Sequence, residues 1–380
     1  MEAAVQSKQA IRYRMPAEWE PHAATWLAWP HYKLDWPGKF EPIPWVYAEI
    51  IRYLSRGERV EVIVKNSAAE KIARKTLKRA HALNDNVRFH RWPTNRVWTR
   101  DSGCAFVFSE SASRNEIQQP HPVSAKNPET RMGHPQELSA VKWRFNAWAK
   151  YPNWKHDEKI GTLMAKATCA NEIRPEFNGN RVVLEGGSIE VNGCGTLITT
   201  EECLLSRMQQ RNPGMKKRDY EDIFAEYLGA SNVIWLDSGI AGDDTHGHVD
   251  DITRFVSPDT VVSCVEADPK SENYEALREN IRRLRDAVTE SGKPLATIDL
   301  PMPAPVYFEG RRLPASYANS YIANGVVLVP VFNDPNDRVA LDILADVFPD
   351  RDVVGIYCGD LIWGFGAIHC MTQQQPKRSH

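Results

Sequence analysis

The sequence predicts an α/β protein in which a strand–helix–strand unit recurs about five times along a chain of 380 residues. Two observations support this prediction. Five stretches carry apolar residues at spacings typical of amphipathic helices, and each is followed by a short β-branched run typical of a strand. Polar residues beside glycines also recur in the linkers between the units, which favours a closed ring whose strand ends converge on one centre.

The expected helices have capping residues at several of their ends, with Asn, Ser or Asp at the start and Gly or Pro at the finish. They cover residues 42–57, 67–83, 217–229, 271–292 and 336–350. The strands expected after them cover residues 59–65, 86–93, 232–238, 294–301 and 352–359. The strands expected before most of them cover residues 23–30, 195–205, 260–268 and 324–334. A doubly wound sheet would also alternate strands and helices, but no G-x-G-x-x-G opens a helix here.

The chain is expected to form a single domain. No low-complexity linker divides it, so residues 1–376 are expected to fold as one unit, with residues 377–380 as a tail. Residues 109–140 are polar, contain prolines and lack periodicity, so they are expected to form a long surface loop.

The composition excludes several classes of partner. Lys and Arg number 47 against 49 Asp and Glu, so no basic excess favours nucleic acid. No apolar run approaches the roughly 18 residues of a membrane span, and the N-terminal residues lack the apolar stretch of a secretory signal. The seven cysteines are odd in number and form no C-x-x-C, so the cytoplasm is the expected compartment. Whether the protein is a homo-oligomer stays open.

Four linkers place polar side chains beside glycines. They are residues 97–103 with Asp101, 184–191 with Glu185, 242–251 with two histidines, and 366–376 with Cys370. Burying Glu185 without a partner would be costly, which favours a role in a site. Trp98 stands three residues before Asp101 and is a candidate pocket wall, because a ring face can hold a cation.

Two chemistries fit these linkers. His246, His248 and Asp250, at spacings of two, would share one face of a strand and could bind the metal of a hydrolase. Alternatively, carboxylates bind a planar guanidinium, the thiolate of Cys370 attacks its central carbon, and a histidine protonates the departing ammonia. This second chemistry is that of a guanidine deiminase, which needs no metal and no organic cofactor.

The same segments resemble the agmatine deiminase family, a branch of the guanidino-group-modifying enzymes close to the peptidyl-arginine deiminases. The resemblance runs nearly end to end through "MPAEWEPHAATWLAWP", "WTRDSG", "WRFNAW", "LEGGSIEVNGCGTLITTEECLL", "GDDTHGHVDD", "SYANSYIANGVVLVPVFNDPND" and "GAIHCMTQQQP". It implies a five-bladed α/β propeller, the pentein fold, and the conversion of agmatine and water to N-carbamoylputrescine and ammonia. The implied partner is a small cationic guanidino substrate.

The resemblance also implies roles for five residues. Cys370 would be the nucleophile, and His248 would be the general acid and base. Asp101 and Asp250 would bind the guanidinium nitrogens. Glu185 would pair with His248 or with the substrate.

Two further residues, Trp98 and Gly366, are expected beside the substrate. His369 is expected to be structural, because strand alternation would turn it away from the face of Cys370.

The chain departs from the usual family pattern around the expected pocket. The departures are Arg96, Glu190, Ser320, Phe365 and Ala367. None removes an expected catalytic residue, but several could reshape the pocket for the amine end of the substrate. Another small guanidino compound is therefore an alternative substrate, and a catalytically silent guanidinium-binding protein is an alternative function.

Overall fold

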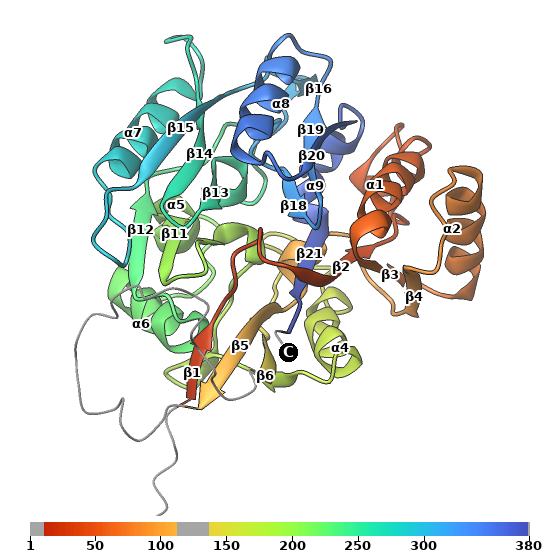
Figure 1. Cartoon of the computed structure of the whole chain (residues 1–380), viewed down its shortest axis with the longest axis horizontal. Helices are drawn as coiled ribbons and strands as arrows, with labels where there is room; N and C mark the ends of the chain where they lie inside the picture. The colour runs from red at the N-terminus through yellow and green to blue at the C-terminus, as the bar shows by residue number, and fades with distance from the viewer. Residues whose placement is uncertain (1–10, 112–136, 379–380) are drawn as a thin grey trace, which may run out of the picture.

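The computed structural model describes residues 11–111 and 137–378, which form a mixed α/β fold. The described strands make five sheets of three or four strands and two two-stranded ribbons. Figure 1 shows helices α2 (Ser67–Arg79), α6 (Lys217–Leu228) and α7 (Tyr274–Arg285) at the periphery, outside the sheets. No helix among the described residues has the length and apolarity needed to cross a bilayer.

One sheet joins the first and last units of the chain. Its strands, in spatial order, are β21 (Thr372–Pro376), β2 (His22–Ala28), β3 (Arg59–Val64) and β4 (Val87–Arg91). β21 is antiparallel to β2, whereas β2, β3 and β4 are mutually parallel and are connected through α1 (Ile43–Gly57) and α2. The pairing of β21 with β2 fixes Cys370, which lies just before β21, against the N-terminal unit.

Three other sheets share a simpler pattern, in which an antiparallel pair is followed by a parallel pair. Their strands are β10 (Glu190–Val191), β11 (Thr196–Thr200) and β12 (Asn232–Leu236); β13 (Thr253–Ser257), β14 (Thr260–Val265) and β15 (Ala296–Pro301); and β18 (Tyr321–Ala323), β19 (Val326–Val331) and β20 (Asp352–Tyr357). The helices between the parallel strands are α5 (Glu201–Leu205) with α6, then α7, then α8 (Asn336–Val347). The predicted recurrence of strand, helix and strand is therefore confirmed.

The fifth sheet has the order β1 (Ile11–Arg14), β5 (Ala105–Ser111), β6 (Glu137–Val141) and β7 (Asn171–Ile173). Helix α4 (Ile160–Ala167) lies between the parallel strands β6 and β7. The prediction of a loop over 109–140 is wrong at both ends, because residues 109–111 belong to β5 and residues 137–140 belong to β6. Residues 112–136 lie outside the described residues. Because the described strands are divided among separate sheets, the doubly wound alternative is also wrong.

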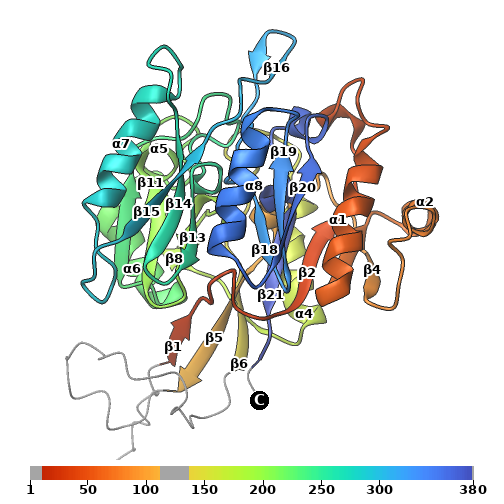
Figure 2. The same ribbon diagram turned by 45° about the horizontal axis from the view of Figure 1, so that its top comes forward.

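Two ribbons complete the described strands. They are β8 (Glu176–Phe177) with β9 (Asn180–Arg181), and β16 (Tyr307–Phe308) with β17 (Arg311–Arg312). Figure 2 shows β16 projecting beyond the body of the molecule. This projection matters for the site, because Phe308 of β16 lines its cavity.

The predicted helices are confirmed, with shorter ends than expected. Helix α7 ends at Arg285 rather than at 292, and residues 289–292 form a separate turn in which Gly292 has a φ of +75°. The strand predicted over 195–205 is wrong after Thr200. The hydroxyl of Thr200 accepts a hydrogen bond from the backbone N–H of Cys203 at 3.1 Å and caps α5, so the chain turns into a helix there.

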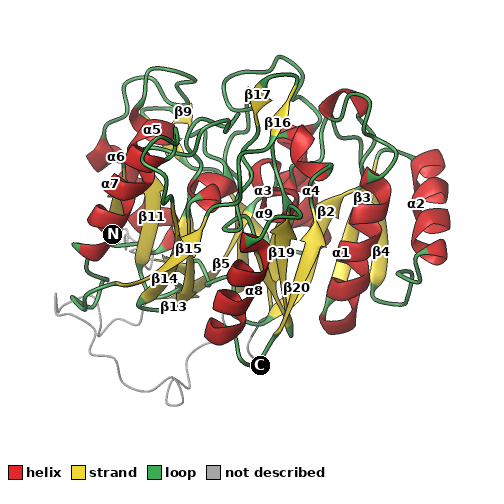
Figure 3. Ribbon diagram, turned by 90° about the horizontal axis from the view of Figure 1, so that it is seen from above, coloured by secondary structure: helices red, strands yellow, loops and turns green. Residues whose placement is uncertain are grey.

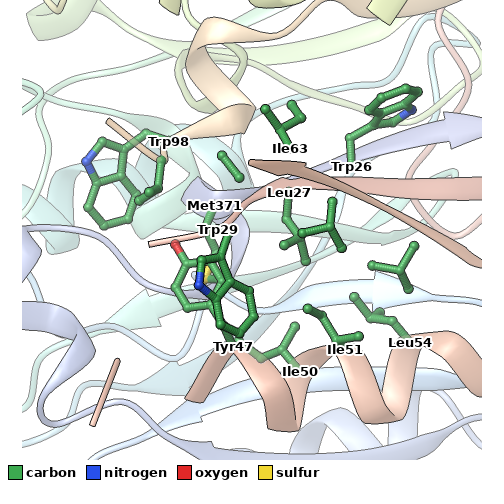
Figure 4. Packing of buried hydrophobic residues seen from close by; sticks show 14 of the residues in the cluster. Trp26, Leu27, Trp29, Tyr47, Ile50, Ile51, Leu54, Ile63, Trp98 and Met371 are labelled. Carbon is green, nitrogen blue, oxygen red and sulfur yellow. The ribbon is translucent and has the colours of Figure 1, made fainter. Parts of the chain in front are cut away.

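The largest hydrophobic cluster of the described residues joins the N-terminal unit to side chains from residues 97–165 and 321–371, and Figure 4 shows part of it. Trp26, Leu27, Tyr47, Ile51 and Met371 each have at most 1% of their surface exposed. Tyr47 and Ile51 are one helical turn apart on α1, so this helix presents an apolar face to β2 and β3. Met371 packs in the same cluster, so the residue after Cys370 is held by the core.

Candidate active site

Four segments that are distant in sequence meet in the interior. They are α3 (Thr99–Ser102), the 3-10 turn Gly186–Ser188, the 3-10 turn Val249–Asp251 and α9 (Ile368–Met371). Contacts join α3 to α9, α3 to the first turn, and the first turn to the second. Figure 3 shows α3 and α9 inside the molecule. The convergence of the polar linkers predicted from the sequence is therefore confirmed.

Cys370 is held by Asn319. The amide oxygen of Asn319 accepts from the backbone N–H groups of His369 at 3.0 Å and Cys370 at 3.3 Å, and its amide nitrogen donates to the Cys370 sulfur at 3.1 Å. The thiol in turn points to Oδ2 of Asp250 at 3.6 Å. Burial, and then the charges of Asp250, Asp251 and Asp101, raises the pKa of Cys370 well above its ordinary value.

Asp101 is oriented by two donors. The indole N–H of Trp148 donates to its Oδ2 at 2.9 Å, and the backbone N–H of Gly187 donates to its Oδ1 at 3.0 Å. Burial raises the pKa of Asp101 to about 6; the charge of His248 opposes this rise, and the charges of Asp250 and Glu185 add to it. Its carboxylate is therefore poised to gain from a bound cation.

His248 is fully buried, and neither of its ring nitrogens has a hydrogen-bond partner among the described residues. Its Nδ1 lies 3.9 Å from Oδ1 of Asp101 and 4.0 Å from Oδ1 of Asp250, and its Nε2 lies 3.7 Å from Oε2 of Glu185. Burial opposes the imidazolium, but the charge of Asp101 and the neighbouring Cys203 and Glu185 outweigh it and hold the pKa of His248 well above its usual value. The ring is thus a buried cation with donors still available.

The turn before His248 is built by Asp243. Its Oδ2 accepts from the backbone N–H groups of Gly247 at 2.7 Å and His248 at 3.0 Å. Gly247 has a φ of +94°, and His246 also has a positive φ of 67°. The segment is therefore a turn rather than a strand.

This turn separates the predicted metal ligands. His246 points to Ser206, with its Nε2 3.1 Å from that hydroxyl, and its Nδ1 lies 3.6 Å from Glu202. Within the described part of the chain, the groups close enough to share a metal are Glu185, Cys203 and His248, and Asp250, Asp251 and Cys370. Neither group contains His246, so the set of His246, His248 and Asp250 proposed for a metal-dependent hydrolase is wrong.

Asp250 and Glu185 each have a fixed partner, His369 and Arg211 respectively. The ring N–H of His369 donates to Oδ2 of Asp250 at 2.7 Å, and its other nitrogen lies 2.9 Å from Oε2 of Glu18. The Nε of Arg211 donates to Glu185 at 3.2 Å, with both side chains fully buried. Although burial raises both pKa values, His369 for Asp250 and Arg211 for Glu185 lower them below the ordinary carboxyl range.

The strand alternation expected to turn His369 away from Cys370 is wrong. Residues 368–371 form the helical turn α9 and not a strand, so alternation does not place the side chain. His369 instead lies behind Asp250, where it fixes the carboxylate that contacts Cys370.

Two glycines leave room for the site. A Cβ at Gly187 would lie 2.6 Å from Nδ1 of His248 and 3.0 Å from carboxylate oxygens of Asp101 and Asp250. A Cβ at Gly366 would lie 2.7 Å from the Trp98 ring and 3.2 Å from Cβ of Cys370. Both glycines are therefore required by close packing, and Trp98 lies against the segment that carries the thiol.

A cavity of about 470 Å³ connects this cluster with the surface. Cys370, Asp101 and Trp98 line it, and Leu34, which is 72% exposed, marks its surface side. The other lining residues are mostly aromatic or charged: Tyr32, Asp35, Pro37, Arg96, Trp148, Tyr151, Pro152, Asn153, Asp244, Thr245, Phe308, Trp363, Gly364 and Phe365. The cavity can accept an elongated molecule whose head reaches the thiol.

Some of the departures from the family pattern line the cavity, and the others lie outside it. Arg96 and Phe365 line the cavity, and Phe365 has a strained φ of +65°. Glu190 lies outside the cavity and pairs with Arg254 at 3.0 Å, and a guanidinium N–H of that arginine also donates to the backbone carbonyl of Ser320. Ala367 is buried just before α9.

Sequence reasoning missed four residues of the site: Asn319, Arg211, Trp148 and Gly187. Asn319 and Trp148 lie in "SYANSY" and "WRFNAW", so the family resemblance contained a sign of them. Gly187 stands beside the predicted Glu185 and was not singled out. Arg211 lies in a loop with no periodicity, and nothing local marks it as the partner of Glu185.

The chain is similar to known deiminases along nearly its whole length. The family described as Porphyromonas-type peptidyl-arginine deiminase matches residues 14–376. The agmatine deiminase of Pseudomonas aeruginosa strain LESB58 is 32% identical, covering 97% of this chain and 96% of that protein. The solved agmatine deiminase of Enterococcus faecalis is 30% identical with a TM-score of 0.82, covering 97% of this chain and 96% of the other.

A second solved structure, an agmatine deiminase of C. jejuni with substrate bound, is 25% identical with a TM-score of 0.80 and covers 100% of both chains. The family match and the identities above 30% over nearly full length are decisive for membership. The chain belongs to the Porphyromonas-type peptidyl-arginine deiminase family, and within it to the agmatine deiminase branch.

Proposed function

We propose that this protein is a cysteine-dependent guanidine deiminase that converts agmatine and water to N-carbamoylputrescine and ammonia. One observation supports this proposal above the others. The thiol of Cys370 and the carboxylate of Asp101 line the same cavity, while the unpartnered ring of His248 lies within 4.0 Å of Asp101, Glu185 and Asp250. The similar agmatine deiminases favour agmatine as the substrate.

Binding begins with the cation. The carboxylates of Asp101 and Asp250 accept N–H bonds from the guanidinium, which brings its central carbon to the thiol. Oδ1 of Asp250 is buried and has no hydrogen-bond partner among the described residues, so a substrate N–H would satisfy it. Trp98 forms the adjoining wall, and Gly366 lets the thiol segment approach it.

The covalent step forms a bond between the Cys370 sulfur and the guanidine carbon, as the thiol proton passes to a neighbouring acceptor. Oδ2 of Asp250, 3.6 Å from the sulfur, is the acceptor in contact. The protonated ring of His248 then gives its proton to one nitrogen, which leaves as ammonia, and an amidino group remains on the sulfur.

Hydrolysis reverses the roles. Neutral His248 takes a proton from water, the oxygen bonds to the amidino carbon, and the carbon–sulfur bond breaks. The product carries a ureido group, its hydroxyl proton passes to the departing sulfur, and the proton taken up by Asp250 is released with ammonia as ammonium. Glu185, fixed by Arg211, stabilises the imidazolium form of His248 during both steps.

We also propose that the five sheets are the blades of a five-bladed α/β propeller formed by residues 1–376. The repeated order of an antiparallel and then a parallel pair supports this arrangement. All seven cysteines are free thiols, which favours the reducing cytoplasm as the compartment.

Ammonia release from agmatine and other guanidines tests the activity. The wild type is expected to release ammonia from agmatine, and Cys370→Ser is expected to remain folded with almost no turnover, because a serine hydroxyl is a far weaker nucleophile. A mass increase equal to the amidino adduct on the peptide containing Cys370 would support the covalent step. Substantial turnover by Cys370→Ser would contradict it.

A further inference from the structure

The cavity contains a carboxylate that the proposed chemistry does not use. Oδ2 of Asp35 is buried and has no hydrogen-bond partner among the described residues. Other buried atoms of the described chain also lack partners, but Asp35 is the only one of those residues that lines the cavity. Leaving a carboxylate oxygen unpaired is costly, so a donor supplied by a ligand would stabilise it.

The position of Asp35 is fixed by the next residue. Trp36 is fully buried, its indole N–H donates to the carbonyl of Leu361 at 2.8 Å, and its ring lies 5.9 Å from that of Trp98. Asp35 ends the 3-10 turn Lys33–Asp35 directly before this anchor. The carboxylate is thus held beside the cavity rather than on a free loop.

Arg96 contacts one oxygen of this carboxylate and leaves the other, Oδ2, without a partner among the described residues. The Nε of Arg96 lies 3.4 Å from Oδ1 of Asp35, while its Nη1 donates to Oδ1 of Asn153 at 2.8 Å. The guanidinium is also stacked over Tyr151, 4.3 Å from the ring centre. Because Arg96 is fixed by these contacts, Oδ2 of Asp35 stays free to accept from a ligand.

The other carboxylate of the outer cavity already has donors on both of its oxygens. Oδ1 of Asp244 accepts from Lys150 at 2.7 Å and Arg311 at 2.6 Å, and its Oδ2 accepts from the hydroxyl of Tyr151 at 2.5 Å. A cationic ligand at Asp244 would meet the positive charges of Lys150 and Arg311, which already neutralise this carboxylate. Asp35 therefore has the available acceptor.

We propose that Asp35 binds the distal ammonium group of the substrate through Oδ2 and so selects guanidines that carry a second cation. This inference rests on the proposed deiminase function, because it assumes that the guanidinium end lies at Cys370. The rings of Tyr32, Tyr151 and Trp363 line the same cavity, and the cations of Arg96 and Lys39 already lie beside them, so this lining tolerates positive charge. The methylene chain of agmatine would span the interval between the two ends.

This selection depends on pH. Burial raises the pKa of Asp35 to about 7; the charge of Arg96 opposes the rise and that of Asp244 adds to it. Tyr47 also lies near Asp35, but burial raises its pKa well above the ordinary value, so it stays neutral. An ionised Asp35 binds ammonium, so KM for agmatine is expected to rise as the pH falls from 8 to 6 relative to KM for a guanidine with an uncharged tail.

Asp157 titrates in the same range, because burial raises its pKa to about 7. Its carboxylate accepts from the backbone N–H groups of Asn95 and Arg96, at 2.6 Å for Asn95. Its protonation would loosen the segment for any substrate. The ratio of KM values for the two substrates removes that shared effect and isolates Asp35.

The test compares agmatine, n-butylguanidine, which lacks the amine, and 4-guanidinobutanoate, which carries a carboxylate there. Asp35→Asn is expected to lower kcat/KM for agmatine about ten- to a hundredfold more than for n-butylguanidine, mainly through KM, because one charge-assisted hydrogen bond is lost. Asp360→Asn is the matched control: it removes the carboxylate that binds Lys39 at 2.6 Å, near Trp363 but not lining the cavity. It is expected to leave the substrate ratio unchanged.

Each outcome separates the two proposals. If the wild type deiminates no guanidine, the proposed function fails. Three other outcomes would leave deimination standing and refute the role of Asp35. The wild type could deiminate agmatine and n-butylguanidine equally well, or it could prefer 4-guanidinobutanoate. The third outcome is that Asp35→Asn lowers kcat/KM for agmatine and for n-butylguanidine by the same factor. The Asp35→Asn variant could be too unstable for kinetic measurements. In that case the wild-type ratio of KM for agmatine to KM for n-butylguanidine is measured between pH 6 and 8. A ratio that does not change over this range contradicts the inference.

Discussion

The amide nitrogen of Asn319 lies 3.1 Å from the sulfur of Cys370, in hydrogen-bond contact with the thiol. The amide oxygen of the same side chain binds the backbone N–H of Cys370 at 3.3 Å. Asn319 therefore orients the thiol segment and also stabilises a developing thiolate, which the surrounding carboxylates oppose. Its place beside the nucleophile is a result of the fold, because the two residues come from different units.

Asn319→Ala is expected to lower kcat about ten- to a hundredfold, since a hydrogen bond to a charged group contributes about 1.5–3 kcal/mol. Asn319→Asp is expected to be worse, because it adds a negative charge next to the sulfur and raises the thiol pKa further. Steady-state kinetics and the rate of alkylation of Cys370 in each variant check this. Wild-type alkylation rates in Asn319→Asp would contradict the proposed stabilisation.

Asp101→Asn and Asp250→Asn are each expected to weaken guanidinium binding and turnover by about tenfold or more, because an amide presents a donor where the substrate N–H needs an acceptor. Asp250→Asn should also disturb His369, which donates to Oδ2 of Asp250 at 2.7 Å. Kinetics with agmatine and binding of a non-hydrolysed guanidine should both be measured. If KM, kcat and the binding constant are unchanged in both variants, the guanidinium group binds somewhere other than at Asp101 and Asp250.

The pH profile of kcat/KM is expected to be bell-shaped. Burial raises the pKa of Asp101 to about 6, so the guanidinium loses an ionised partner as the pH falls through that value. On the alkaline side, loss of the His248 proton removes the acid that expels ammonia, at a pH well above the ordinary range for histidine. The limbs belong to interacting groups rather than to single residues.

The same charges predict how Cys370 reacts before substrate binds. Its pKa is raised, so the free enzyme holds a neutral thiol, and the bound guanidinium draws the proton away. A neutral alkylating agent is expected to react slowly at pH 7, and a cationic amidine with a leaving group much faster. Fast alkylation by the neutral reagent at pH 6 would show a preformed thiolate and overturn this step.

Removal of metals is expected to leave activity unchanged, because the proposed chemistry assigns every proton and bond to Cys370, His248 and the carboxylates. His246→Ala is expected to retain most activity, since His246 contacts Ser206 and Glu202 instead of the site. Dialysis against a chelator, followed by assay with and without added zinc, checks both statements. If activity falls on dialysis and returns with zinc, the protein must bind a metal through residues other than the set of His246, His248 and Asp250.

The sequence predicted the chemistry of the site better than its architecture. Cys370, His248, Glu185, Asp101 and Asp250 meet as expected, because each stands in a glycine-containing linker between regular elements. The metal hypothesis failed at His246, since it assumed a strand where Asp243 binds the backbone of a turn. Helices α3 and α9 were not predicted, because elements this short have too few residues to show a period.

Local sequence was enough to establish five helices with their following strands and to identify the five polar residues of the proposed chemistry, because apolar periodicity and motif spacing are properties of neighbouring residues. The tertiary structure alone decided which partners these residues have. Folding brings together the segments that pair Arg211 with Glu185 and Asn319 with Cys370. It also leaves the buried Oδ2 of Asp35 without a partner among the described residues. The pKa of each buried group depends on those partners and on its exclusion from water, so no local pattern could have specified the charge state of the site.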